Sequence, residues 1–421
     1  MSAPLRDPCA EPAASTSSSD LAASSSSSKP VASGGLTLGL PRSKGGGGAK
    51  ASSSSSTPTA LELRKRHEDD SIRSTDNDAI GSRLSAIQAG YLEKEPFSQL
   101  LYAGPPASSS SSSHSPTLNP PPTLHRPPII NIGTYLRCTA IDRIVASFLA
   151  SSGGKAQIVS LGAGSDSRFW RIAADPNLSP RLAHYLELDF SSVTARKLAS
   201  IQRQPALSQP LGEPTLERCG LLSPRYALRG CDLRRLADEG EILTSLDPSR
   251  PTLILAECVL SYMPPQESVD VLAAVARRME ETTPVAAVCY EMCVAGEGAD
   301  EGATMMGKFG QTMLRNLETR GLSLSGARQY RTTSSHVERL QAGLSLPAIT
   351  QTPRRASSLS LARIYSSSLS PTLRNRINRI EGLDEVEELQ MLLGCYAVSW
   401  GVRGGDETLP ASLERALRSI E

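Results

Sequence analysis

The stretch QIVSLGAGSDSRFW, residues 157–170, joins an apolar run to two glycines one residue apart. The run Ile158–Leu161 predicts a buried strand, and Gly162 and Gly164 predict a turn at which the backbone approaches a ligand closely. Ser167 stands at the third position of the dinucleotide-binding pattern G-x-G-x-x-G, so that pattern is incomplete. Glycines also follow strands for turn geometry alone, and both readings stay open at this point.

Other apolar runs along the chain predict an α/β fold. Segments with helical spacing, among them 134–150, 193–202 and 265–280, alternate with these runs. Continuously apolar strands are typical of a Rossmann-like parallel sheet with helices on both faces. A late run, 395–402, has no helix after it in register, and we expect it to join the sheet as an antiparallel strand. The other expected strands are 185–189, 226–233, 251–258 and 284–291.

Low-complexity sequence sets the expected domain boundaries. Residues 1–70 are rich in serine and glycine, and such sequence has too little apolar surface to offset the entropy lost on ordering, so we expect a disordered tail. One folded domain is expected over 71–421, with a low-complexity insertion at about 104–127. The region 344–370 has no clear pattern.

Composition excludes several classes of protein. A formal net charge of +1 without a basic stripe argues against nucleic-acid binding. No apolar run approaches the roughly 20 residues that cross a bilayer, and no apolar signal core is present at the start. The 8 cysteines are scattered without metal-site spacing, which indicates reduced thiols in the cytoplasm and no metal centre.

Three acids follow the expected strands and indicate the kind of ligand. Asp189 can accept hydrogen bonds from ribose hydroxyls, Asp232 can receive an adenine amino group, and Glu257 ends the fourth strand. Helix capping is the alternative role for Asp189 and Asp232. An acid-lined rim disfavours a pyrophosphate and suits a nucleoside that carries a sulfonium, so S-adenosylmethionine is expected rather than NAD.

Arg137 adds the opposite charge. It lies four residues before Ile141 and shares the core-facing stripe of its helix, so its guanidinium needs a carboxylate partner. The methionine carboxylate of the cofactor is one candidate. A guanidinium that extends to solvent is the other reading.

Several motifs, in this order, resemble those of the leucine carboxyl methyltransferases. The resemblance runs from about residue 76 to 400, and the motifs are specific only when taken together. They are GTYLRCTAIDRIVASFL, QIVSLGAGSDSRFW, YLELDFSSVTARK, GCDLRRL, LILAECVLSYMPP, FGQTMLRNLETRGLSLSG and INRIEGLDEVEELQMLLGCYAVSWG.

The resemblance implies a class I methyltransferase fold, S-adenosylmethionine as cofactor, and methylation of the C-terminal leucine carboxylate of the protein phosphatase 2A catalytic subunit. We expect a monomer that binds neither nucleic acid nor membrane. The cofactor-binding residues that the resemblance implies are Arg137, Gly162, Asp189, Asp232, Leu233, Glu257 and Arg83. The chain departs from the family in the insertion before 128, in the acidic insertion 296–303 and around 357–370.

The chemistry of such a transfer needs no general base. A terminal α-carboxyl has a pKa near ~3.5 and is ionised at neutral pH. Catalysis is then expected to depend on alignment and desolvation of the carboxylate. Arg168, Tyr262 and Tyr290 are the candidates for substrate contact, and Gln311 and Arg315 share one helix face in the segment that resembles the substrate region.

Four other functions remain open from the sequence. The nearest is the related carboxyl methyltransferase of tRNA wybutosine synthesis, whose relatives carry an added β-propeller, whereas this chain has no repeats. A small-molecule O-methyltransferase is the second. A non-catalytic protein that keeps the fold is the third, and a nicotinamide oxidoreductase, disfavoured by Ser167 and the acidic rim, is the fourth.

Overall fold

The computed structural model describes residues 59–102, 124–295, 307–345 and 355–421. The expected disorder of residues 1–58 and most of the expected insertion, 103–123, lie outside the described residues. Residues 124–127 of that insertion lead directly into a helix.

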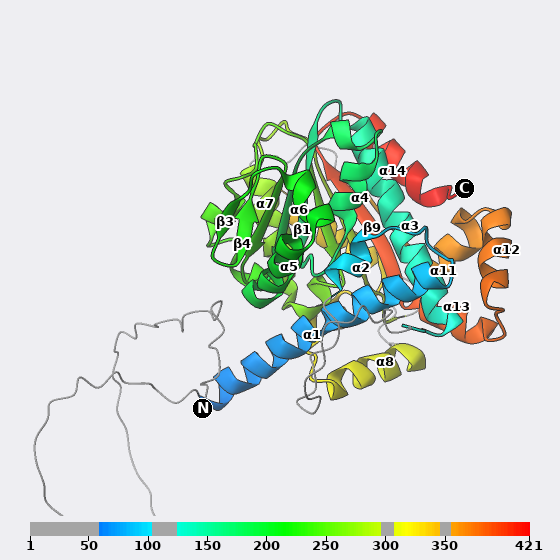
Figure 1. Ribbon diagram of the computed structural model, residues 1–421. Helices are drawn as coiled ribbons and strands as arrows, with labels where there is room; N and C mark the ends of the chain where they lie inside the picture. The colour runs from blue at the N-terminus through cyan, green and yellow to red at the C-terminus, as the bar shows by residue number, and fades with distance from the viewer. Residues whose placement is uncertain (1–58, 103–123, 296–306, 346–354) are drawn as a thin grey trace, which may run out of the picture.

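A single sheet of nine strands forms the centre of the described chain, in the order β3-β4-β5-β2-β1-β6-β7-β9-β8 (Figure 1). The five strands from β5 to β7 are parallel, and β9 runs antiparallel to both β7 and β8. The strands are β1 (Ala156–Leu161), β2 (Leu182–Asp189), β3 (Thr215–Glu217), β4 (Gly220–Leu222), β5 (Tyr226–Gly230), β6 (Thr252–Glu257), β7 (Val285–Met292), β8 (Arg355–Ser360) and β9 (Tyr396–Arg403).

The sheet confirms the predicted α/β class and the late antiparallel strand. β1 lies between β2 and β6, so Ile158 pairs in register with Tyr185 on one side and Leu253 on the other. The chain therefore winds outward in both directions from β1, and ligands of such sheets bind outside the carboxyl ends of the strands at this reversal.

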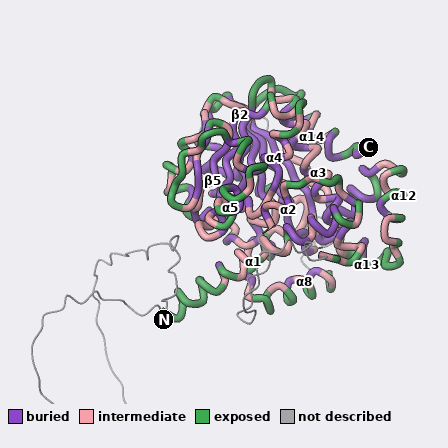
Figure 2. Tube along the Cα trace, viewed as in Figure 1, coloured by how far each residue is buried: buried purple, intermediate pink, exposed green. Residues whose placement is uncertain are grey.

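Helices cover both faces of the sheet, because central strands such as β1 carry apolar side chains on both faces. All residues of β1 are buried, with Ile158 in one apolar cluster and Val159 and Leu161 in the other. Complete burial of one such side chain contributes roughly 1.5–3 kcal/mol. Figure 2 shows the buried strands between more exposed helices. One face is covered mainly by α3, α4 and α14, and the other by α7 and α10.

The helices connect and cover these strands. The α-helices are α1 (Ala60–Gln88), α2 (Phe97–Leu101), α3 (Pro128–Ser151), α4 (Arg168–Ala174), α5 (Ser191–Arg203), α6 (Pro205–Ser208), α7 (Pro265–Arg278), α8 (Lys308–Thr319), α9 (Ser325–Gln329), α10 (Thr333–Gly343), α11 (Leu361–Arg363), α12 (Pro371–Ile380), α13 (Val386–Gly394) and α14 (Thr408–Arg418). Shorter turns are η1 (Ser179–Arg181), η2 (Gln209–Leu211), η3 (Leu233–Arg235), η4 (Gly240–Leu243), η5 (Leu260–Tyr262) and the π-helical η6 (Ile364–Ser368).

Helix α1 corrects the predicted tail boundary at residue 70. It begins at Ala60, where Thr59 and Glu62 form a capping box that satisfies the first free amides. Its first turns are exposed, which is why hydrophobic periodicity did not reveal them, whereas its second half is buried through Ile80, Leu84 and Ile87. In Figure 1 this helix runs along the lower edge of the sheet.

Two further differences concern the sheet. The third parallel strand, β5, ends at Gly230 rather than at 233, because Asp232 starts the turn η3. The unplaced region 344–370 contains β8, a serine-rich edge strand of intermediate burial that pairs with β9.

None of the described helices is long and apolar enough to span a membrane.

Candidate active site

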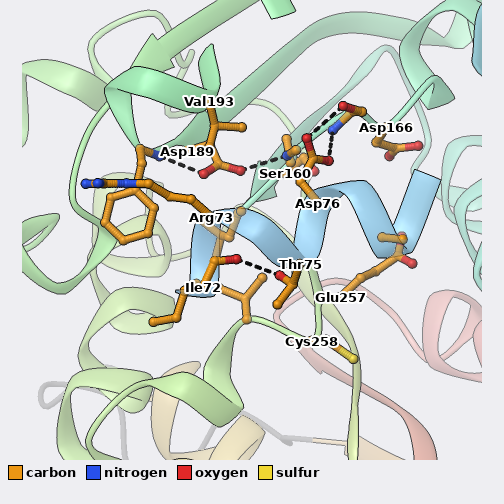
Figure 3. Close-up of a pocket in the computed structure, with 18 of the residues that line it drawn as sticks. Ile72, Arg73, Thr75, Asp76, Ser160, Asp166, Asp189, Val193, Glu257 and Cys258 are labelled. Atoms are coloured by element: carbon orange, nitrogen blue, oxygen red, sulfur yellow. Dashed lines mark hydrogen bonds between the residues drawn. The ribbon is translucent and has the colours of Figure 1, made fainter. Parts of the chain in front are cut away.

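A cavity of about 340 Å³ opens at the carboxyl ends of β1, β2 and β6, and α1 lies across it (Figure 3). This volume falls within the range of roughly 300–1,000 Å³ typical of small-molecule sites. The turns after the three strands supply one wall, and α1 and α3 supply the other. The cavity therefore lies where the strand order predicts a ligand site.

The glycine turn after β1 is shaped by close contacts on both of its glycines. Gly162 has a φ of +59°, and a Cβ there would lie 2.5 Å from Cγ2 of Val259. Gly164 has a φ of +47°, and a Cβ there would lie 2.5 Å from Oδ1 of Asp76 on α1. Both positions therefore require glycine, because a side chain would be strained and would displace a wall of the cavity.

Asp189 closes the turn from the end of β2. Its Oδ2 accepts a hydrogen bond from the Gly164 amide at 2.7 Å, and its Oδ1 accepts one from the Phe190 amide at 2.7 Å. Burial, helped by the nearby carboxylate of Asp76, raises the pKa of Asp189 to about 6. The residue lines the cavity, as the sequence predicted, and it also supports the glycine turn.

Arg137 and Glu257 form an ion pair across the cavity. Arg137 Nε lies 2.6 Å from Glu257 Oε2, and Arg168 Nη2 lies 2.8 Å from Glu257 Oε1. Burial would raise the pKa of Glu257, but Arg137 and Arg168 outweigh it and lower that pKa, so the carboxylate is ionised. The predicted core-facing Arg137 does take a carboxylate partner, and in this structure that partner is Glu257.

The guanidinium of Arg168 is buried and pairs with several carboxylates. Its side chain is only 4% exposed and also pairs with Asp142 at 3.0 Å and Asp166 at 2.5 Å. These carboxylates outweigh burial and raise the pKa of Arg168. Arg168 lines the cavity, and because it pairs with three carboxylates a contact with a substrate carboxylate would have to compete with them, so its substrate role stays a prediction.

The two candidate tyrosines differ in position. Tyr262 lines the cavity at the end of η5, as expected for a substrate contact. Tyr290 is not part of the cavity wall. It stacks on Tyr396 with ring centroids 5.3 Å apart, and the guanidinium of Arg137 lies 5.3 Å from its ring. Tyr290 therefore supports Arg137 from behind, which corrects its predicted role.

Asp232 both caps a turn and lines the cavity with Leu233. It accepts the Arg234 amide at 3.1 Å, which is the capping role that the sequence left open. Its carboxylate also pairs with the Arg234 guanidinium at 2.7 Å, and Arg234 reaches Asp69 of α1 at 2.9 Å. This chain of contacts joins α1 to the rim of the sheet.

Arg83 and Ser167 belong to a second connection between α1 and the rim. Arg83 lines the cavity and its Nε donates to Ser98 Oγ at 3.0 Å. The Glu95 carboxylate lies 3.1 Å from Ser167 Oγ and accepts a short hydrogen bond from Ser98. Ser167 thus replaces the third glycine of the dinucleotide pattern with a hydroxyl that anchors the segment after α1.

Apart from Arg83, sequence reasoning missed the residues that α1 contributes to the cavity. Asp76 Oδ1 accepts the Ser165 amide at 2.7 Å and its Oδ2 accepts the Ser165 hydroxyl at 2.8 Å. Ile72, Arg73 and Thr75 line the same wall (Figure 3). The Thr59 capping box and the spacing of Ile80, Leu84 and Ile87 were the available signals of this helix.

The described lining contains no histidine, and the described residues contain no cluster of His, Cys, Asp or Glu suited to a metal ion. His336 is buried against the carbonyl of Met292, and burial lowers its pKa to about 3. Gln311 and Arg315 lie on one exposed face of α8, as predicted, but outside the cavity lining. The cavity thus offers charge and shape and no evident proton-transfer pair.

Comparison with known proteins decides the family. Residues 74–276 match the leucine carboxyl methyltransferase family. A leucine carboxyl methyltransferase 1 from Mycosarcoma maydis is 34% identical, covering 81% of this chain and 79% of that protein. One from Bos taurus is 32% identical, covering 81% and 92%. Among solved structures, the plantazolicin methyltransferase BamL aligns with 79% of this chain and 100% of its own, at 10% identity and a TM-score of 0.37.

The chain belongs to the leucine carboxyl methyltransferase family. It is therefore a methyltransferase, and S-adenosylmethionine is its cofactor, as the sequence predicted. The family match, residues 74–276, includes the turns after β1, β2 and β6 that form the rim of the cavity.

The cavity fits this cofactor on two observations. The turn at Gly162 and Gly164 lines the cavity without side chains of its own, and a Cβ at either glycine would lie 2.5 Å from the side chain of Val259 or Asp76. Carboxylates such as Asp189 and guanidiniums such as Arg137 line the same cavity, so it offers acceptors for ribose hydroxyls and for a sulfonium as well as a cation for the methionine carboxylate.

Proposed function

We propose that this chain methylates the α-carboxylate of the C-terminal leucine of the protein phosphatase 2A catalytic subunit, which forms a methyl ester. The names of its relatives support the leucine carboxyl group as the acceptor. The observation that carries the chemistry is a cavity lined by both acids and arginines at the carboxyl edge of the sheet.

The proposed cofactor contacts divide by charge. Asp189 would receive the ribose hydroxyls, and Gly162 would leave room for the backbone to approach the cofactor. Arg137 would hold the methionine carboxylate and release part of its contact with Glu257. Asp232 and Leu233 would lie beside the adenine, and Arg83 would add a further cation at the α1 side.

The mechanism requires positioning rather than acid-base catalysis. The cofactor supplies a methyl group bound to a positively charged sulfur. The acceptor carboxylate is already ionised at neutral pH, since a terminal α-carboxyl has a pKa near ~3.5. Residues of the cavity then have to hold that carboxylate in line and exclude water, and alignment alone can contribute roughly 7–11 kcal/mol. Tyr262 at the cavity wall is the proposed substrate contact.

Peptide methylation tests the proposal. Labelled S-adenosylmethionine is incubated with two peptides that carry the C-terminal sequence of the phosphatase subunit, one ending in leucine carboxylate and the other in leucine amide. We expect a base-labile ester on the first peptide and no label on the second. Equal labelling of both peptides would instead indicate methylation of a side chain.

Two additional acceptors address the remaining alternatives. N-acetyl-leucine tests for a small-molecule O-methyltransferase, and bulk tRNA tests for a wybutosine-pathway enzyme. Labelling of either at the rate of the peptide would contradict the proposal. Cofactor binding without any labelled product would favour a non-catalytic protein. We propose that the enzyme is cytoplasmic and acts as a monomer.

A further inference from the structure

The buried carboxylate of Glu291, near the end of β7, binds the turn that follows β6. Glu291 Oε1 accepts the amides of Val259 at 3.1 Å and Leu260 at 2.8 Å. Glu291 Oε2 accepts the Ser261 amide at 3.1 Å and a short hydrogen bond from the Ser261 hydroxyl. Three successive amides and one hydroxyl therefore converge on a single side chain that is 1% exposed.

The same turn contains a strained residue. Among the described residues, Cys258 is the one non-glycine residue with a positive φ, at 54°. Side chains other than glycine rarely adopt this conformation, and it persists only where the surroundings enforce it. Its amide donates to the carbonyl of Tyr290 at 2.7 Å, which fixes the residue on the β7 side, and the Glu291 contacts begin at the next residue.

This turn forms a large part of the cavity. Glu257, Cys258, Val259, Tyr262 and Met263 all line it. The Val259 side chain occupies the space that the missing Cβ of Gly162 leaves free. A shift of the turn would therefore move the partner of Arg137 and close or open the glycine turn at the same time.

The turn is also supported from outside. A Cβ on Gly326 of α9 would lie 2.2 Å from the carbonyl oxygen of Leu260, so the backbones are in direct contact. The turn is thus held between α9 and Glu291. Only Glu291 provides hydrogen bonds to the three amides among the described contacts.

We infer that Glu291 is a positioning residue, whose carboxylate holds Cys258 in its strained conformation and thereby sets the cofactor-binding geometry of the turn Glu257–Tyr262. This inference rests on the proposed cofactor contacts of Glu257 and Gly162. Glu291 does not line the cavity, so it acts through the turn and not by contact with cofactor or substrate.

A double-mutant cycle between Glu291 and Cys258 tests the inference. The full-length chain is prepared as wild type, Glu291→Gln, Cys258→Gly and the double variant, and calorimetry measures the Kd for S-adenosylhomocysteine. In Glu291→Gln an amide NH₂ faces backbone N–H groups, and we expect Kd to rise roughly tenfold as the strained residue relaxes. Glycine adopts this conformation without strain, so in the Cys258→Gly background the same substitution should raise Kd only about twofold.

Two further variants keep the result decisive. Val288→Ala on β7 removes buried side-chain volume without contacting the turn, and it should lower the melting temperature while leaving Kd unchanged. Ser261→Ala removes one of the four hydrogen bonds and should raise Kd roughly threefold even if Glu291→Gln fails to fold.

The outcomes separate the inference from the proposed function. A wild-type chain that binds no S-adenosylhomocysteine would count against the proposed function itself. If the wild type binds and both Glu291→Gln and Ser261→Ala bind equally well, the positioning role is wrong. If Glu291→Gln raises Kd by the same factor in the wild-type and the Cys258→Gly backgrounds, the part of the inference that concerns strain is overturned.

Discussion

The two walls of the cavity are built differently. The rim of the sheet consists of turns that follow β1, β2 and β6, and these strands are buried on both faces. The opposite wall belongs to α3 and to α1, whose first turns are exposed and which reaches the rim through side chains such as Asp69 and Asp76. We therefore expect the rim to supply most of the cofactor affinity and α1 to adjust it.

Ion pairs, by contrast, connect the two walls. The described arginines that line the cavity are each engaged with a carboxylate, and these pairs often join one wall to the other. Arg234 of the rim pairs with Asp69 of α1, for example, at 2.9 Å. Pairs of this kind hold the walls together without leaving a large net charge in the cavity.

Loss of Asp189 should have the largest effect. Asp189→Ala removes the acceptor for the Gly164 amide and for the proposed ribose contacts, so the Kd for S-adenosylhomocysteine should rise roughly a hundredfold. Calorimetry measures this change. Asp238→Ala, which replaces an exposed acid, is the matched control, and unchanged binding in Asp189→Ala would mean that β2 does not contribute to the site.

A substitution on α1 should have a smaller effect. Asp76→Asn removes the charge that binds Ser165, and we expect Kd for S-adenosylhomocysteine to rise roughly tenfold. Glu68→Gln on the same helix, which loses only its contact with Arg64, should bind as the wild type does. An effect of Asp76→Asn as large as that of Asp189→Ala would remove the proposed distinction between the walls.

The pH dependence of binding should sharpen the comparison further. Burial and then Asp76 raise the pKa of Asp189 to about 6, and the ionised form accepts more hydrogen bonds from the ligand. Affinity should therefore be full above that pKa and fall as the pH drops through it, by roughly fourfold between about pH 7 and about pH 5.5. Stability of the ligand-free protein should change in the opposite sense, because a raised carboxyl pKa contributes stability at low pH that is lost as the pH rises.

Calorimetry across this range tests the pH prediction. In Asp76→Asn the midpoint should move to lower pH, since one of the causes of the raised pKa of Asp189 is removed. A flat pH profile in the wild type would show that the protonation of Asp189 does not control binding.

The exposed start of α1 should give the smallest effect. Leu61 is 77% exposed, so Leu61→Ala should change the free energy of unfolding by less than about 0.5 kcal/mol. Leu84 on the same helix is 3% exposed, and Leu84→Ala should cost about 2–5 kcal/mol. Chemical denaturation of both variants measures the difference, and equal losses would mean that the first turns pack against another part of the chain.

The rim could be predicted from sequence because its residues follow continuous apolar strands. Gly162, Asp189 and Glu257 come at the ends of such runs, so their common edge follows from the topology. Asp76 could not be found in this way, because its position depends on how α1 docks against the sheet. The edge strand β8 was missed for a related reason, since its serine-rich sequence carries little hydrophobic signal.

Neighbouring residues on β7 show the limit of such reasoning. Tyr290 was predicted to reach the substrate, yet it lies behind Arg137. Glu291 was not among the predicted site residues, yet it binds three amides of the turn after β6. Successive side chains of a strand point to opposite faces, and the sequence does not state which face meets the turn.

The position of β9 between β7 and β8 has a consequence for synthesis of the chain. β8 leaves the ribosome before β9, yet it pairs with β9 and not with β7. The outer edge of β7 therefore stays open until residues 396–403 emerge. An unpaired edge of this kind invites association between chains, so nascent chains halted before Tyr396 should depend on chaperones more than completed ones.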